Sequence, residues 1–103
     1  MRIVPPRRRN QWRVDITAEL ADGRKIAIEY DGAYWHADKV DKDAEKSRDL
    51  LAAGYLVARL REDPLPGLPI DDSRYAEFSV YATAPQPDRV LASVHEWAVS
   101  IDG

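Results

Sequence analysis

The sequence lacks cysteine and any long apolar run. Its 103 residues contain no cysteine, which excludes a disulfide framework, a thiolate nucleophile and a cysteine-ligated zinc site. No stretch is long and apolar enough to span a bilayer. Residues 1–11 have no apolar segment of the kind found in a signal peptide. We therefore expect a cytoplasmic protein that does not associate with membranes.

Glycine is scarce as well, and its five copies stand apart from one another in the sequence. Isolated glycines exclude a glycine-rich phosphate-binding loop, and the sequence has no serine-centred nucleophile turn. Hydrophobic residues make up 45% of the chain and charged residues 32%, which is typical of one globular domain at this length.

Negative charge is missing from the first thirteen residues, which hold five arginines and no acid. The remaining residues carry ten basic against eighteen acidic side chains, a net charge of −8. We predict that residues 1–11 form a basic arm, flexible or extended, and that residues 12–103 form a single domain. The arm either grips nucleic-acid phosphates or serves only as a solvated tail; the candidate phosphate contacts here are Arg7, Arg8, Arg9 and Arg13.

Apolar periodicity predicts an α/β fold. Alternating residues indicate half-buried strands over 12–20 and 25–31, and further strands are expected over 55–62 and 75–82. Helical periodicity appears over 39–53 and from a cap at Asp88 to Ile101. Residues 33–36 are predicted to be an exit loop. The expected architecture is a small mixed sheet of about four strands that starts with a β-hairpin and is flanked by two helices.

The turn between the first two strands fixes their register. A three-residue loop with Gly23 in the left-handed region pairs Leu20 with Arg24 and keeps one face of the hairpin apolar. In that register Ile16 faces Ile28, and Asp15 faces Glu29 with their Cβ atoms roughly 5 Å apart.

Two facing carboxylates need a compensating positive charge, because like charges directly opposite destabilise a sheet by up to ~1 kcal/mol. Asp31 lies on the same face as Glu29 and adds a third carboxylate. A Mg²⁺ or Mn²⁺ ion bound by Asp15, Glu29 and Asp31 would supply the charge. Salt bridges from Arg13 or Lys25 are the alternative.

Other polar residues near the hairpin are open to two interpretations. His36 is either a general acid–base group or metal ligand, or a surface histidine. Lys46 either reaches a phosphate or lies on a solvated helix face. Arg59 and Arg61 share one side of the third strand, where they contact a phosphate or close the sheet edge. His95 is expected to be inert.

The strand residues Val14-Asp15-Ile16, a short turn, and the string IAIEYDGAYWH from Ile26 to His36 form a recognisable pattern. It resembles the restriction-endonuclease-like PD-(D/E)xK superfamily, in its very-short-patch repair endonuclease-like branch. The helix that follows, Gly54 and the third strand are also similar to that branch, so the resemblance runs from about Trp12 to Leu68.

The resemblance implies a restriction-endonuclease-like core that hydrolyses DNA phosphodiester bonds with Mg²⁺ or Mn²⁺. By position, Asp15 would be the central metal ligand and Glu29 the second acid. Asp31 stands where the superfamily usually has lysine, so Lys46 is the substitute for that lysine, and His36 matches the histidine of a Trp-His pair. The alternative is an inactive module on the same fold that binds nucleic acid or a protein. RNA as a partner, a homodimer, and a fragment of a longer chain remain open.

Overall fold

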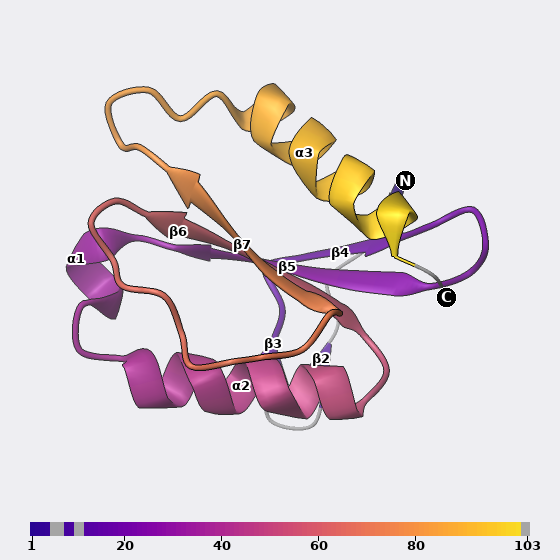
Figure 1. Ribbon diagram of the computed structural model, residues 1–103, viewed down its shortest axis with the longest axis horizontal. Coiled ribbons are helices and arrows are strands. Elements are labelled where there is room, and N and C mark those ends of the chain that lie inside the picture. The colour runs from indigo at the N-terminus through magenta and orange to yellow at the C-terminus, as the bar shows by residue number, and fades with distance from the viewer. Residues whose placement is uncertain (5–7, 10–11, 102–103) are drawn as a thin grey trace.

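The protein is an α/β fold built on one mixed sheet, as expected from the sequence (Figure 1). The structure is a computed structural model that describes residues 1–4, 8–9 and 12–101, with only the backbone of Val4, Arg8, Arg9 and Trp12. Five strands form the main sheet in the order β1-β4-β5-β6-β7, and β2 and β3 form a separate pair. The strands are β1 Arg2–Val4, β2 Arg8–Arg9, β3 Trp12–Arg13, β4 Ile16–Glu19, β5 Lys25–Asp31, β6 Leu56–Glu62 and β7 Tyr75–Val80. The helices in the described residues are α1 Ala33–His36, α2 Val40–Ala52 and α3 Pro87–Ser100.

The predicted register of the first hairpin is confirmed. Strands β4 and β5 are antiparallel with Ile16 opposite Ile28, and the Leu20 N–H donates to the Arg24 carbonyl over 2.8 Å. Gly23 has a φ of 91°, a conformation that an L side chain rarely adopts. The three-residue turn therefore sets which residues of the two strands lie side by side.

The single strand predicted over residues 12–20 is wrong, because the chain bends at Asp15. Residues 12–13 pair with β2, and the ladder with β5 begins only at Ile16. The bend changes the alternation of side chains. Val14, expected beside Ile16 and Ala18, instead packs on the opposite side of the sheet with Leu50 and Val57.

Both faces of the sheet are covered, which corrects the expectation of half-buried strands. Helix α2 lies on one face and α3 on the other (Figure 1). Strands β5 and β6 are parallel and joined through α2. Parallel central strands are usually buried on both sides because their connections place helices over the faces. Thr17, Ala27 and Glu29, which alternate with the apolar residues of the hairpin, are all buried.

The remaining elements follow the predicted pattern with shifted ends and additions. The expected sheet of about four strands has five in the described residues, because Arg2–Val4 pairs with β4 at the edge. Ala33–His36 forms one helical turn where a loop was expected. The last helix begins at Pro87, so Asp88 lies in its first turn and Gln86 occupies the cap position. None of the described helices has the length and apolarity needed to cross a membrane.

Candidate functional site

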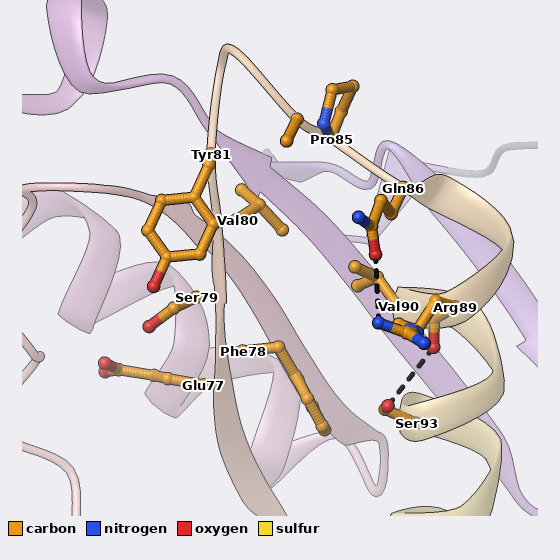
Figure 2. A pocket seen from close by; sticks show the side chains of 11 residues that line it. Glu77, Phe78, Ser79, Val80, Tyr81, Pro85, Gln86, Arg89, Val90 and Ser93 are labelled. Atoms are coloured by element: carbon orange, nitrogen blue, oxygen red, sulfur yellow. Dashed lines mark hydrogen bonds between the residues drawn. The ribbon is translucent and has the colours of Figure 1, made fainter.

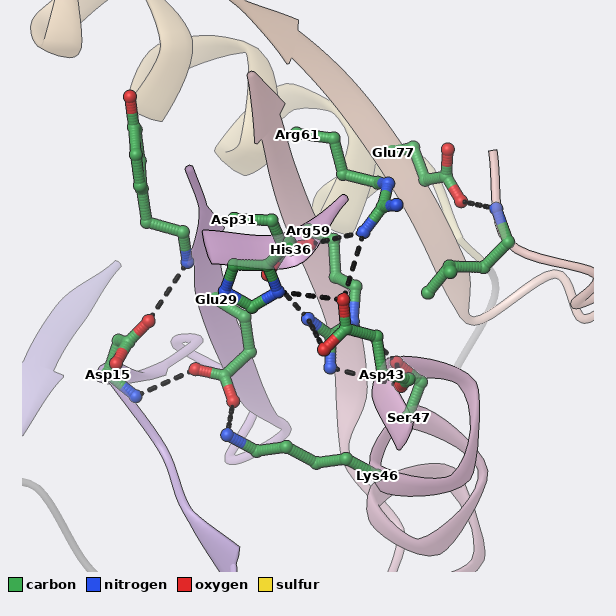
Figure 3. Close-up of polar contacts among 12 residues, drawn as sticks. Asp15, Glu29, Asp31, His36, Asp43, Lys46, Ser47, Arg59, Arg61 and Glu77 are labelled. Carbon is green, nitrogen blue, oxygen red and sulfur yellow. Dashed lines mark hydrogen bonds and ion pairs between the residues drawn. The ribbon is translucent and has the colours of Figure 1, made fainter. Parts of the chain in front are cut away.

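Asp15 and Glu29 are linked where the strand is broken. The Asp15 N–H donates to Oε2 of Glu29 over 2.8 Å, and Oδ2 of Asp15 accepts the N–H of Tyr30 over 3.0 Å (Figure 3). Asp15 is exposed to solvent and Glu29 is buried. The two carboxylates thus replace the ladder hydrogen bonds that the bend removes, and residue Asp15 lies beside Glu29 as the register predicted.

Lys46 on α2 completes this group. Its ammonium forms an ion pair with Oε1 of Glu29 and donates a hydrogen bond to the Arg13 carbonyl. Burial and, to a smaller extent, the nearby guanidinium of Arg59 lower the pKa of Lys46 to about 8, against the opposing effect of the Asp15 carboxylate. We refer to Asp15, Glu29 and Lys46 as the strand-break site.

Asp31 is held by arginines instead of joining Asp15 and Glu29. Its Oδ1 accepts a hydrogen bond from Nη1 of Arg59 over 2.7 Å, and its Oδ2 accepts one from Nη1 of Arg61 over 2.8 Å. All three side chains are buried. The salt-bridge alternative therefore describes Asp31 better than the metal, although the partners are Arg59 and Arg61 in place of Arg13 or Lys25.

Arg59 and Arg61 were expected to contact phosphate, and this placement is a correction. Arg59 is 1% exposed and Arg61 4%, so neither guanidinium is available to a nucleic-acid backbone. Arg59 also donates from Nε to the Ser47 hydroxyl over 2.7 Å and from Nη2 to the Asp43 carbonyl over 3.1 Å. A guanidinium carries five donors, and the two contacts to Ser47 and Asp43 fasten α2 onto the sheet.

Asp43 is the functional candidate that the sequence interpretation missed. His36 Nδ1 lies 2.8 Å from Asp43 Oδ2 and 3.7 Å from Asp31 Oδ1, so the three side chains form one group (Figure 3). One ligand atom from each lies within 4.8 Å of the others, which is a spacing that could hold a metal ion. A signal was present in the sequence: Asp43 and Ser47 are four residues apart on the same side of the helix as Leu50.

The two candidate metal positions, at Asp31 with Asp43 and at the strand-break site, differ in their local charge. The carboxylates of Asp31 and Asp43 are already balanced by the two buried guanidiniums of Arg59 and Arg61, which approach to between 2.7 and 4.0 Å. A divalent ion added there would meet two fixed cations at low dielectric. The strand-break site has two carboxylates against one lysine, which leaves a net negative charge. The local charge of the strand-break site is therefore more negative than that of the group formed by Asp31 and Asp43 with the two arginines.

The other predicted site residues lie outside these groups. The side chains of Arg7, Arg8 and Arg9 fall outside the described part of the chain. Arg13 is exposed and contributes its carbonyl to Lys46. His95 is exposed on α3.

Two pockets open beside the first turns of α3. The larger, about 490 Å³, lies between β7 and α3 and is lined by residues such as Glu77, Phe78, Arg89 and Ser93 (Figure 2). It includes no residue of the strand-break site. The smaller, about 200 Å³, includes Asp15 among its lining residues.

Comparison with protein-family models, with curated proteins and with solved structures finds no match to this chain. The fold defines a small α/β protein with a mixed five-stranded sheet, and the site must be interpreted from its own chemistry.

Proposed function

We propose that this protein is a metal-dependent nuclease that hydrolyses phosphodiester bonds of DNA at the strand-break site. The observation that carries the proposal is the convergence of Asp15, Glu29 and Lys46 from three separate elements of the sequence. The resemblance of the hairpin to restriction-endonuclease-like proteins supports the same assignment. Two acids and a lysine are the groups that such a reaction needs.

The donor set fits Mg²⁺ or Mn²⁺. Magnesium keeps several waters and is held by one or two carboxylates together with substrate phosphates. Asp15 Oδ1 has no hydrogen bond to any of the described residues, and Glu29 Oε1 faces the exchangeable ammonium of Lys46. Asp15 and Glu29 would hold the ion, which would supply Lewis-acid stabilisation of charge on the phosphoryl oxygens.

Lys46 supplies the proton chemistry. A lysine with a pKa of about 8 is partly neutral near physiological pH, so its Nζ can accept a proton from the attacking water. In its charged form the same group stabilises negative charge on the phosphate. The ion pair with Glu29 holds Nζ only while it is charged, whereas the Arg13 carbonyl can accept a hydrogen bond from it in either protonation state.

The test is cleavage of plasmid DNA, and separately of a short RNA, with and without Mn²⁺. We expect cleavage of DNA by the wild type only with metal, and a loss of at least about a hundredfold in Glu29→Gln and Asp15→Asn. Lys39→Gln, an exposed lysine near the start of α2, is the matched surface control and should cleave like the wild type. Equal rates in all four proteins would refute the assignment.

A binding module without catalysis is the second candidate, and one observation favours it. Each of the two carboxylates already accepts a backbone N–H across the strand break, so both have a structural reason to be there. Titration with Mn²⁺ separates the candidates. A nuclease binds the ion through Asp15 and Glu29, and the affinity falls in Asp15→Asn. A purely structural pair shows no binding at millimolar metal.

A further inference from the structure

The smaller pocket lies on the α3 side of the sheet and has almost entirely apolar walls. Its volume is about 200 Å³, and apart from Asp15 and Tyr30 every lining side chain is apolar, including Leu60, Val80 and Leu91. A closed apolar cavity of about 150 Å³ is enough to bind a benzene ring. The pocket therefore has room for one planar ring.

Hydrogen bonds join this pocket to the strand-break site. Asp15 lines the pocket, its Oδ2 accepts the N–H of Tyr30, and its own N–H donates to Glu29. Alternate residues of a strand point to opposite faces. Glu29 consequently faces α2 while Tyr30 faces the pocket, and Asp15 stands between them at the break. A substrate group bound near Asp15 would therefore lie close to Glu29 on the α2 side and to Tyr30 on the α3 side.

Tyr30 provides an oriented aromatic ring at this place. Its side chain is 44% exposed, and its hydroxyl donates to Oε2 of Glu62 over 2.8 Å. Glu62 is itself held, because its Oε1 accepts the N–H of Ala33 over 3.2 Å. The hydrogen bond to Glu62 raises the pKa of Tyr30, so the hydroxyl remains protonated. Aromatic rings fixed in this way are common stacking platforms for nucleic-acid bases.

We propose that this pocket receives an unstacked nucleobase of the substrate strand, next to the phosphodiester that a metal ion on Asp15 and Glu29 would bind. The inference rests on the proposed function and names its substrate class as DNA with unpaired bases. The apolar walls offer stacking and burial without hydrogen-bond partners for the base edges, so all four bases are accepted. A base inside a duplex is stacked and paired, and extracting it costs free energy. Single strands and frayed ends are therefore preferred over intact duplex.

The experiment measures how much the bases contribute to binding. The probes are a short oligothymidylate and an abasic oligonucleotide of the same length, each with a fluorescent label, and Ca²⁺ replaces Mg²⁺. For the wild type we expect the oligothymidylate to bind about tenfold more tightly than the abasic strand.

Four variants test whether the ratio of the affinities for oligothymidylate and the abasic strand depends on the pocket. Leu91→Trp fills the pocket from α3, and Tyr30→Ala removes the ring; each should reduce the ratio to below about twofold. Tyr30→Phe keeps the ring and should keep the ratio. Ser93→Trp is the matched control, because Ser93 is on the same helix and lines the larger pocket but not the smaller one. Circular dichroism checks that each variant is folded.

Each outcome decides the proposal. A wild-type ratio near one, an unchanged ratio in Leu91→Trp and Tyr30→Ala, or no binding of either strand overturns the base pocket. Cleavage of oligothymidylate by a wild type whose ratio is near one rejects the pocket and keeps the nuclease. The expected ratios in a protein that never cleaves reject the nuclease and keep the pocket.

Discussion

The two faces of the sheet bury different kinds of side chain, although neighbouring residues of one strand contribute to both. On β5, Ile28 packs toward α3 among aliphatic side chains, while Glu29 and Asp31 face α2 among charged ones. On the α3 face, stability requires only that the apolar side chains fill the space between the helix and the sheet. The α2 face needs a positive charge for every carboxylate that it removes from water.

The two faces also differ in how many charged side chains they bury. Buried ion pairs seldom stabilise a fold more than well-packed apolar residues would, because desolvation offsets their attraction. The α2 face nevertheless carries Glu29, Asp31, Asp43, Arg59 and Arg61 in buried positions. A small domain has little stability to spare. Four of these five residues form the network that fastens α2 to the sheet, and only Glu29 belongs to the strand-break site.

The largest effect on stability is expected where a charge on the α2 face loses its partner. Arg59→Met leaves Asp31 with one guanidinium and removes the donors that Arg59 supplies to the Ser47 hydroxyl and the Asp43 carbonyl. We expect the free energy of unfolding to fall by about 3–5 kcal/mol. Urea denaturation measures it. Arg89→Met on the exposed side of α3 is the control, with a change within about 0.5 kcal/mol. Similar losses in both variants would contradict the contrast between the faces.

A smaller effect is expected from an equally buried site on the apolar face. Ile26 is fully buried in the α3 core, and Ile26→Val removes one methylene without leaving any polar group unpaired. The expected loss is about 0.5–1.5 kcal/mol by the same denaturation experiment. A loss equal to that of Arg59→Met would mean that packing, and not charge pairing, limits stability on both faces.

The smallest effect is a pH dependence that belongs to Lys46. Its pKa of about 8 in the folded protein lies below its ordinary value of 10.5, so the unfolded chain binds more protons between these values. The free energy of unfolding should therefore rise as pH rises from 8 toward 10, and it should fall as pH drops through 8. Urea denaturation at pH 7.5 and 9.5 measures this. Lys46→Arg, which stays charged, should lose the dependence; the same slope in both proteins would disprove it.

Local sequence patterns were sufficient for α2, α3, β5, β6, β7 and the register of the hairpin. The turn at Gly23 fixed the pairing of Ile16 with Ile28, and apolar periodicity located α2 and the strands to within a few residues. The bend at Asp15 could not be predicted in this way, since Trp12 to Leu20 alternates without interruption. The side-chain carboxylate of Glu29, fourteen residues away, is what satisfies the backbone at the bend.

The candidate site could likewise be predicted only in part from the sequence. The register placed Asp15 beside Glu29, and Lys46, named as the substitute for the motif lysine, forms an ion pair with Glu29. The partners of Asp31 were missed because Arg59 and Arg61 lie 28 and 30 residues further along the chain. The pairing of a buried charge depends on which strands are neighbours, and no local period encodes that.

The sequence by itself determined an α/β chain whose first hairpin brings two carboxylates together, because turn geometry and side-chain alternation act over a few residues. Only the tertiary structure decided which cation lies beside each acid. The parallel pairing of β5 with β6 sets Arg61 directly beside Asp31 and brings Arg59 within reach of it, while α2 gives Glu29 only a lysine. The physical reason is that electrostatic pairing depends on distance in space, which long-range strand order controls.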